Sequence, residues 1–471
     1  MGWMNRYFRL RENGTTVRIE VLAGITTFLT MAYIIFVQPA VLSGQMFGMS
    51  TGMDIGAVTV ATCLSAALAT AVMGLYARYP IALAPGMGEN FFFVFTVIGA
   101  ATAAGFPQPW RVALGVVFIS GVLFFILYAL GIREKIFDAL SPSLKNGIAA
   151  GIGIFIAFIG LQNAGFIVKS PGTLVTLNTQ FASPDIVLFG VGLIITLALL
   201  ARHVRGAILW GMLATTLLAV LARLVLPHVP ALAGIGVVAE SKLMTRFALS
   251  GEIVSLPPSL GPTLFQMDLV HAAHVVMWPF ILVFLFMDVF DTVGTLVGVG
   301  EQAGFIKDNK LPRARQAMLA DQTGTLVGAV FGTSTVTSFI ESAAGVEAGG
   351  RTGLTALTTS GCFLLALFFA PLIAMVGSYS PITSPALVVV GAMMVRNVSK
   401  IDWSDFSELA PAFLIMIGIP LCYSISDGLA LGFLAYPFIK LLAGRGREVS
   451  PAMYVIAVAL MGYFVMRAMV K

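Results

Sequence analysis

Carboxylic acids inside long apolar stretches constrain this chain more than any other feature of its sequence. Asp288 and Asp291 interrupt the run FILVFLFMDVFDTVGTLVGVG, and Glu341 lies in FGTSTVTSFIESAAG, with Asp321 shortly before it. An ionised side chain in hydrocarbon costs several kcal/mol, about 3 on insertion scales. Such a residue is tolerated where it faces a cavity or a partner. The pattern therefore predicts a membrane transporter whose buried acids handle a polar substrate, a proton, or both.

The composition favours a membrane protein over a soluble multi-domain protein. Of the 471 residues, 58% are hydrophobic and 10% are charged, whereas soluble domains carry about 25% charged residues. The basic residues behind the net charge of +5 fall in short loops. They set membrane topology there and do not indicate binding of nucleic acid. The cysteines all lie in apolar segments, which favours small core residues over a disulfide or a metal site: Cys63, Cys362 and Cys422.

Apolar segments of spanning length recur along the whole chain. We expect spans near residues 20–40, 53–76, 85–99, 111–131, 146–165, 184–201, 206–226, 273–299, 316–331, 335–346, 353–373, 382–396, 409–424 and 427–441, and a further C-terminal hydrophobic helix at 452–469. Basic residues such as Arg78 and the cluster at 307–315 follow even-numbered spans. The positive-inside rule then predicts a cytoplasmic N-terminus over 1–19 and an extracellular loop over 227–272.

Two segments are too short and too interrupted to be ordinary spans. One is ALAPGMGENFFFVFTVIG, which contains Glu89 and Asn90, and the other is VFGTSTVTSFIESAAG from Val330. Interrupted segments in matching positions of two halves indicate a transporter site, where half-helix termini face the ligand. The halves are weakly similar, and a Ser–Pro pair opens a span in each. Seven spans per half would make the two halves inverted repeats, because seven is odd.

Five motifs resemble a known family in their order along the chain. They are TMAYIIFVQPAVL, APGMGENFFF, GLQNAG, MDVFDTVGTLVG and ADQTGTLVGAVFGTSTVTSFIESAAGVEAGGRTGLTA. Together they closely resemble the AzgA-like purine permeases. These belong to the nucleobase–cation symporter family, which includes bacterial uracil permeases and nucleobase–ascorbate transporters. The resemblance runs from about residue 16 to 455.

The resemblance implies an all-α integral membrane fold of fourteen transmembrane segments, arranged as two inverted seven-span repeats. A core domain would cover 20–131 and 273–373, and a gate domain 146–226 and 382–441. Spans 3 and 10 would each contain a short strand, and the two antiparallel strands would meet beside the substrate. Family members take up purine nucleobases with protons by an elevator-like movement and form homodimers. The resemblance thus implies a plasma (inner) membrane protein with a proton as coupling ion and no other cofactor.

The family's site residues carry over to matching positions. Asp288 corresponds to the span 8 acid that hydrogen-bonds the base, and Glu341 to the span 10 acid at its other edge. Asn90 corresponds to the polar residue of span 3 beside the substrate. Asp321 corresponds to the supporting acid of span 9, and Asp291 is expected in the same network as Asp288.

The chemistry of these residue types agrees with a purine ligand. A carboxylate can accept two N–H bonds from one rigid purine edge. Burial favours its protonated form, so one group can couple proton and base. We expect Phe91 to stack on the base, since such stacking contributes about 1–3 kcal/mol, and Thr337 to lie beside it. Glu89 departs from the family pattern, because many relatives have an aliphatic residue there. Three roles are open for Glu89: a second protonatable group, a determinant of base preference, or a partner of a basic residue.

Structural roles compete with these assignments. Asp288 could partner backbone groups, and Glu341 could merely cap the half-helix of span 10. Asp321 could cap span 9 or pair with Arg315 or Arg351. The sequence alone leaves these alternatives open.

Other functions also compete. A sodium-coupled nucleobase permease, or a uracil or xanthine permease, fits the same carboxylates. An anion transporter of the same fold is disfavoured, because anion sites need positive charge. An enzyme finds little support, since His271 and His274 form a possible metal pair without a third ligand. The preferred interpretation is a proton-coupled transporter for hypoxanthine, guanine, adenine or xanthine.

Overall fold

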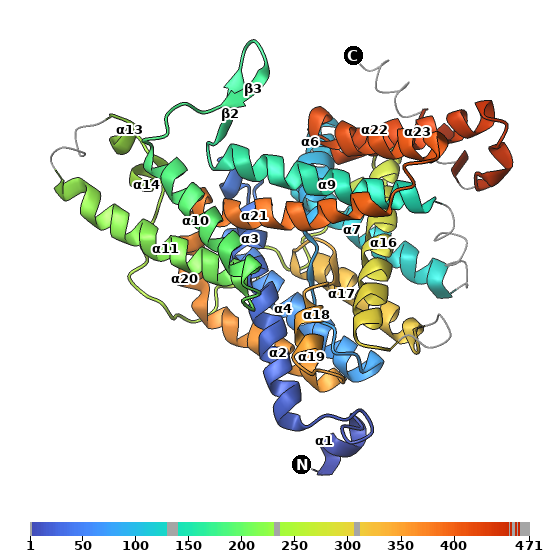
Figure 1. Ribbon diagram of the computed structural model, residues 1–471, viewed down its shortest axis with the longest axis horizontal. Helices are drawn as coiled ribbons and strands as arrows, with labels where there is room; N and C mark the ends of the chain where they lie inside the picture. Colours follow the sequence, from blue (N-terminus) through green and yellow to red (C-terminus); the bar gives the residue numbers. More distant parts are fainter. Residues whose placement is uncertain are drawn as a thin grey trace. The chain divides into compact units, whose positions relative to one another are not determined.

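The computed structural model describes residues 2–129, 140–229, 236–305 and 311–461, apart from residues 452, 455, 456 and 459. These residues are mostly helical (Figure 1). Among them, nine helical segments are long and apolar enough to cross a membrane: Val17–Leu42, Ile55–Ala77, Pro109–Tyr128, Pro142–Asn163, Pro184–Ala201, Ala207–His228, Val275–Gly300, Gly353–Gly377 and Ser380–Lys400. Shorter apolar helices cover Met87–Ala103 and Phe406–Leu421. These segments agree with a multi-pass membrane protein.

Part of the expected topology stays a prediction. This applies to the number of fourteen spans and to the core and gate domains. The expected helix at 452–469 lies largely outside the described residues.

The chain divides into two compact units. The first comprises Met1–Asn90, Ile159–Met267 and Asp291–Val389, and the second comprises Phe91–Phe158, Asp268–Phe290 and Val390–Lys471. Three long helices carry residues of both units: α9 (Pro142–Asn163), α16 (Trp278–Gln302) and α21 (Ser380–Val395).

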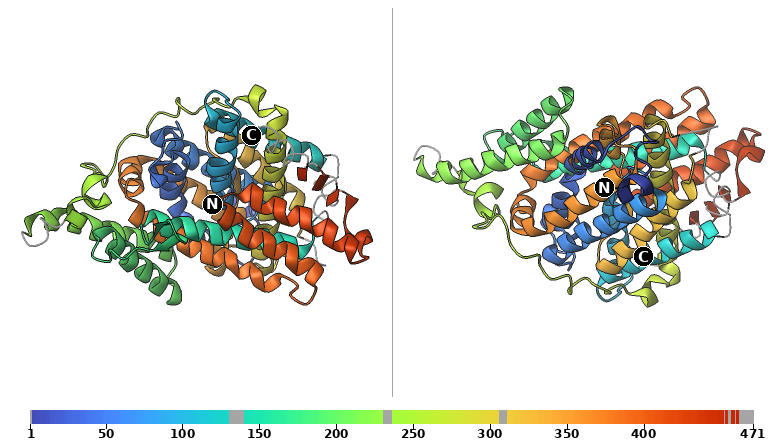
Figure 2. Two further views of the ribbon diagram at one scale, coloured as in Figure 1. Left: turned by 90° about the horizontal axis from the view of Figure 1, so that it is seen from above. Right: turned by 90° about the horizontal axis from the view of Figure 1, so that it is seen from below.

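Helix α4 (Ile55–Val72) is the centre of the first unit. It packs against three helices: α3 (Tyr33–Leu42), α17 (Ala314–Phe331) and α19 (Gly353–Ala366). Around this group, α19 packs on α2 (Val17–Met31), which also contacts α18 (Ser342–Glu347), and α20 (Ala370–Gly377) packs on α3. In the same unit α10 (Pro184–Ala201) and α11 (Ala207–Val225) lie side by side (Figures 1 and 2).

Small residues allow backbones of the first unit to approach closely. A Cβ atom on Gly353 would lie 1.8 Å from the carbonyl oxygen of Gly74. Helices inside membranes commonly associate through such small residues, because no hydrophobic force drives them together in lipid. The start of α19 therefore requires glycine at position 353.

A buried carboxylate ties α2 to the start of α19. Glu20 accepts hydrogen bonds from the backbone N–H groups of Arg351 at 2.9 Å and of Thr352 and Thr355 at 3.2 Å. The hydroxyls of Thr352 and Thr355 donate to the same carboxylate at 2.8 and 2.7 Å. A negative charge at a helix N-terminus is favourable because the N–H groups there lack helical partners. Glu20 is thus a structural acid that caps α19.

The second unit contains α7 (Pro109–Ala129), α15 (Leu269–Ala272), α22 (Phe406–Cys422) and α23 (Ile425–Leu442). Helices α22 and α23 lie side by side, and α15 packs on α7. The extended backbone before α15 is joined to α7 by the Asp268 N–H, which donates to the Arg111 carbonyl oxygen at 2.9 Å.

An ion network closes one end of the α22–α23 pair. The Lys440 side chain is only 1% exposed, and its Nζ lies 2.9 Å from Glu408 Oε1 and from Glu448 Oε2. The Arg445 guanidinium donates to Asp405 at 2.6 Å and to both oxygens of Glu448 at 2.7 and 2.8 Å. A bidentate arginine–carboxylate pair is among the stronger charged interactions in proteins.

This network predicts that stability falls in acid. Hydrogen bonds from Ser407 and Arg445 hold the pKa of Asp405 well below its usual value. Hydrogen bonds from Arg445 and Lys440 lower the pKa of Glu448 from 4.5 to about 2. A carboxyl whose pKa is lowered by folding stabilises the fold above its unfolded pKa and loses that contribution as pH falls through the folded pKa. We expect the melting temperature in detergent to decrease between about pH 4.5 and 2.

The matched comparison is Glu448→Gln against Glu252→Gln, since Glu252 is an exposed residue of the first unit. The Glu448 variant should lose part of the acid dependence, whereas the Glu252 variant should retain all of it. Identical pH profiles for the two variants would contradict the assignment.

Candidate functional site

Two short strands lie inside the first unit and position the candidate site. β1 (Leu83–Pro85) and β4 (Val336–Ser338) are buried and pair antiparallel. The register joins Leu83 to Ser338, Ala84 to Thr337 and Pro85 to Val336. The Gly86 N–H extends the pair by donating to the Thr335 carbonyl oxygen at 3.0 Å. These strands occupy the two interrupted segments of the sequence, so each strand leads directly into a short helix.

Hydroxyl groups satisfy the outer edges of this two-stranded sheet. Thr70 on α4 accepts from the Leu83 N–H at 2.9 Å, and its hydroxyl donates to the Leu83 carbonyl oxygen at 3.1 Å. Thr325 on α17 donates to the Val336 carbonyl oxygen at 3.1 Å. Extended backbone at membrane depth is tolerated only where its polar groups find partners within the protein. The threonine hydroxyls therefore make hydrogen bonds to the strand edges that neighbouring strands would make in a larger sheet.

Asp321 on α17 fixes β4 to its surroundings. Its Oδ1 accepts hydrogen bonds from the N–H and the hydroxyl of Ser338, both at 2.8 Å. Its Oδ2 accepts from the hydroxyl of Thr292 on α16 at 2.6 Å, and Thr292 also contacts the Thr337 hydroxyl at 3.1 Å. The carboxylate is fully buried. These contacts suit the supporting role expected for Asp321, and they involve neither Arg315 nor Arg351.

Glu341 stands at the start of α18, where β4 has ended. Its Oε1 accepts a hydrogen bond from the Tyr33 hydroxyl at 2.7 Å, and its carbonyl oxygen accepts from Thr30 at 3.3 Å. Its side chain makes no capping hydrogen bond to α18 and is half-buried. The carboxylate of Glu341 is therefore held beside Tyr33 and does not cap α18.

Asp291 on α16 differs from the other acids in its exposure. Its side chain is exposed although it lies in the middle of an apolar helix. It interacts electrostatically with Glu341 and with Glu89, and it contacts the Thr337 hydroxyl. Asp291 and Glu341 are thus the accessible acids of this group, whereas Asp321 and Glu89 are buried.

Asn90 belongs to a buried amide network near the strand pair. Its amide nitrogen donates to the side-chain Oε1 of Gln38, and its own amide oxygen accepts from the Ser334 hydroxyl. Gln38 in turn donates to Thr333 at 2.9 Å and to Ser334 at 3.0 Å. The network joins α3, α5 (Met87–Phe91) and the chain before β4.

Glu89 lies in the first turn of α5 and is almost fully buried. Its carboxylate folds back toward the start of the helix, because a Cβ atom on Gly86 would lie 2.2 Å from Glu89 Oε2. The same Cβ would lie 2.9 Å from the Thr337 side chain. Glycine at position 86 therefore makes room for the acid next to the strand pair.

Two predicted site residues, Asp288 and Phe91, belong to the second unit. Asp288 is buried in α16, one turn before Asp291. Phe91 is buried at the end of α5, and its ring lies 6.1 Å from that of Phe95 and 6.4 Å from that of Phe155. The structure thus brings six of the eight predicted residues together in the first unit: Glu89, Asn90, Asp291, Asp321, Thr337 and Glu341.

Sequence reasoning missed Tyr33 and Gln38. Both lie in the motif TMAYIIFVQPAVL. A buried amide in an apolar run is a signal that could have identified Gln38, because an unpartnered amide is costly there. Nothing in the sequence indicates that Tyr33 meets Glu341.

The possible histidine pair is explained by local contacts. His271 Nδ1 lies 2.6 Å from Asp268 Oδ2, and His274 Nδ1 accepts from the Val276 N–H at 3.4 Å. The described residues contain no group of three or more His, Cys, Asp or Glu side chains suited to a metal ion.

Comparison with known proteins decides the family. Residues 18–431 match the model of the permease family. The chain belongs to this family. It is 44% identical to the guanine/hypoxanthine permease PbuG of Bacillus subtilis, over 98% of this chain and 99% of that protein. It is 38% identical to the adenine permease AdeP of Escherichia coli, over 97% of this chain and 94% of that protein. The predicted family membership is confirmed.

A solved transporter shares the fold of this permease. The transmembrane domain of the cyanobacterial bicarbonate transporter BicA superposes with a TM-score of 0.59 at 14% identity, covering 89% of this chain and 97% of that domain. At this identity the likeness concerns the fold alone. The permease therefore has the fold of a helical membrane transporter.

The contacts of Asp321 yield a test of its supporting role. Asp321→Ala removes the acceptor of the Ser338 N–H and hydroxyl and leaves Thr292 only its contact with the Thr337 hydroxyl, and each buried donor that loses its partner costs about 1–3 kcal/mol. Asp321→Asn keeps one oxygen for Ser338, and its amide can donate to Thr292. We therefore expect Ala to lower the free energy of unfolding in detergent by about 3 kcal/mol or more, and Asn by about 1 kcal/mol. Equal losses for Ala and Asn would contradict this account.

Proposed function

We propose that this permease takes up purine nucleobases together with protons. The accessible carboxylates of Asp291 and Glu341 carry the proposal, because they lie beside a buried strand pair in a membrane permease. Relatives named as guanine/hypoxanthine and adenine permeases support the substrate class. Hypoxanthine, guanine, adenine and xanthine are the proposed substrates.

The substrate contacts follow from the chemistry of the purine edge. A purine offers adjacent ring and exocyclic N–H donors in one plane, and a carboxylate can accept two of them. Glu341 is the proposed acceptor. The Tyr33 hydroxyl donates to Glu341 Oε1 and so fixes the orientation of the carboxylate. Asp288 binds the opposite edge, and Phe91 stacks on the ring. Asn90 and Thr337 complete the set of proposed substrate-binding residues.

Coupling to protons follows from crowding of the acids. Asp291 interacts with Glu341 and Glu89, and like charges in a low-dielectric site disfavour each other. A proton relieves this repulsion, and a bound purine changes the affinity for that proton. By linkage the proton changes the affinity for the purine by the same factor. Asp291, Asp321 and Glu89 are the proposed coupling and supporting residues.

The transport cycle uses the architecture implied by the family. Fourteen spans form two inverted repeats, and a core domain carrying the site moves against a gate domain in an elevator-like manner. Gate domains pair into a homodimer in the plasma membrane, with the N-terminus in the cytoplasm. Half-helices after β1 and β4 direct backbone N–H groups toward the ligand. The described strand pair and the short helices α5 and α18 support this arrangement.

Uptake of radiolabelled hypoxanthine into cells expressing the protein tests the proposal. Unlabelled adenine, guanine and xanthine should compete, and a protonophore should abolish accumulation. Glu341→Gln should lower uptake about 10- to 100-fold, because it removes a charged acceptor of purine N–H groups. The matched control is Glu240→Gln, an exposed acid outside the site, which should transport normally.

Three results would overturn parts of the proposal. Competition by uracil alone would replace the purine by a pyrimidine. Uptake that requires sodium and survives the protonophore would replace the proton as coupling ion. Uptake of bicarbonate without any nucleobase uptake would replace the substrate class by an anion.

Tyr33→Phe tests the geometry of Glu341 separately. The variant keeps the ring and removes the hydroxyl that donates to Glu341 Oε1. A hydrogen bond to a charged group contributes about 1.5–3 kcal/mol. We expect the apparent KM for hypoxanthine to rise about tenfold with a normal level of protein in the membrane. Unchanged KM would show that Tyr33 does not position the acid.

A further inference from the structure

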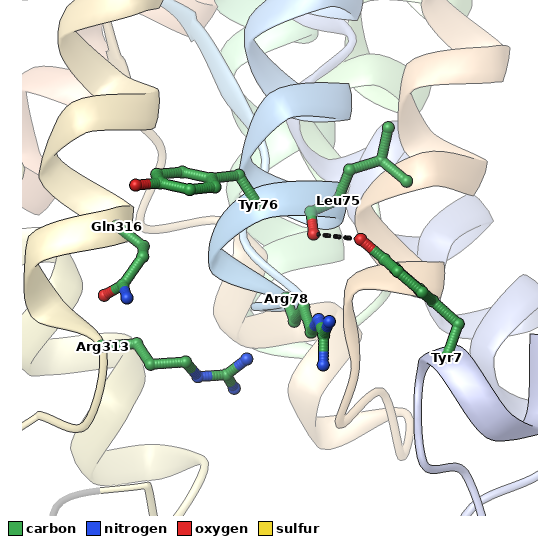
Figure 3. A pocket seen from close by; sticks show the side chains of 6 residues that line it. All are labelled: Tyr7, Leu75, Tyr76, Arg78, Arg313 and Gln316. Carbon is green, nitrogen blue, oxygen red and sulfur yellow. Dashed lines mark hydrogen bonds between the residues drawn. The ribbon is translucent and has the colours of Figure 1, made fainter.

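A basic pocket of 530 Å³ opens in the first unit, apart from the candidate transport site. Its six lining residues come from α1 (Gly2–Tyr7), from the chain around η2 (Met73–Ala77) and from the start of α17: Tyr7, Leu75, Tyr76, Arg78, Arg313 and Gln316. None of them is acidic. Figure 3 shows the Arg313 side chain extending toward Arg78 on the floor of the pocket, with Tyr76 above.

Aromatic rings hold the two guanidinium groups in place. Arg78 Cζ lies 4.5 Å from the centre of the Tyr7 ring, and the Tyr7 hydroxyl is anchored on the Leu75 carbonyl oxygen at 2.9 Å. Arg313 Cζ lies 5.2 Å from the centre of the Tyr79 ring. A cation–π contact of this kind restrains a guanidinium over the ring. In the described part of the chain neither arginine forms an ion pair with an acid.

Both arginines occupy backbone conformations that favour glycine. Arg78 ends η2 with φ of 59°, and Arg313 precedes α17 with φ of 57°. Left-handed backbone is unfavourable for a residue with a long side chain. Strain of this kind gathers at functional sites, where a particular side chain is needed. Two residues with unfavourable backbone conformations thus place their guanidinium groups in the same pocket.

The rest of the lining is amphipathic. Leu75 and Tyr76 are exposed, at 41% and 53% of their surface, and they end a helical segment long enough to span the membrane, Ile55–Ala77. The pocket therefore lies where a spanning helix meets the polar interface. An apolar wall beside paired arginines suits a ligand with a charged head and an apolar part.

We propose that this pocket binds the phosphate group of an anionic ligand at the membrane interface. Arginine forks match phosphate oxygens bidentately, and paired arginines offer both charge and donors. The phosphate belongs either to the headgroup of an anionic phospholipid, whose glycerol and acyl part contacts Leu75 and Tyr76, or to a soluble phosphate ester. Because η2 and α17 pack on each other and α17 carries Asp321, occupancy of the pocket stabilises the first unit.

Thermal unfolding of the full-length protein in a neutral detergent tests the site. The probes are short-chain phosphatidylglycerol, short-chain phosphatidylcholine and glycerol phosphate. Phosphatidylglycerol should raise the melting temperature in a saturable way, since a ligand that binds the folded state stabilises it, and phosphatidylcholine should raise it less. Arg78→Gln/Arg313→Gln should weaken the apparent affinity at least about tenfold. The control Arg202→Gln/Arg205→Gln removes the same charge from an exposed turn and should leave binding unchanged.

The outcomes separate the sources of the phosphate. Saturable stabilisation by phosphatidylglycerol alone, lost in the pocket variant, assigns a lipid. Equal stabilisation by glycerol phosphate assigns a soluble ester. Equal affinities in the pocket variant and the turn variant overturn the proposal. If the glutamine pair does not fold, Arg78→Lys/Arg313→Lys keeps the charge and loses the fork, and unchanged affinity in that variant also overturns the proposal.

Discussion

The centre of the first unit depends on the hydrogen bonds that the Asp321 carboxylate accepts. One oxygen holds the backbone and hydroxyl of Ser338 in β4, and the other holds Thr292 in α16. A strand of three residues cannot stand alone, since even a complete hairpin is marginal in water. Here β4 is placed by one buried charge that three donors share. The positions of Thr337, in the middle of β4, and of Glu341, shortly after it, follow from this placement.

A carboxylate buried in this way also limits which acids of the site are able to bind a ligand or a proton. Removing one partner of a buried charged group costs more than the group contributes, because the remaining groups stay desolvated. The acids therefore divide by their contacts. Asp321 and Glu20 have their oxygens filled by backbone and hydroxyl donors, whereas the Glu341 carboxylate accepts from Tyr33 and the Asp291 side chain is exposed. Acids with unfilled acceptor capacity can bind a ligand or a proton, and acids with filled capacity shape the protein.

The sequence predicted the class of the protein and the places of the interrupted segments well. Hydropathy, the Gly–Pro breaks and the acids are local features, so they can be read without a structure. It did not predict what each acid contacts, because Glu20 meets residues near 351 and Tyr33 meets Glu341 across more than 300 positions. The partners of Gln38, Asn90 and Ser334, are likewise distant in the chain.

The likeness to a bicarbonate transporter sharpens the distinction between fold and function. A single helical framework can serve different substrates when the residues around its site differ. A bicarbonate ion requires positive charge and free N–H donors, whereas the first unit gathers Glu89, Asp291, Asp321 and Glu341 around one strand pair. This excess of acid repels an anion and attracts a proton. A neutral, donor-rich solute such as the proposed purine base suits a site of this kind.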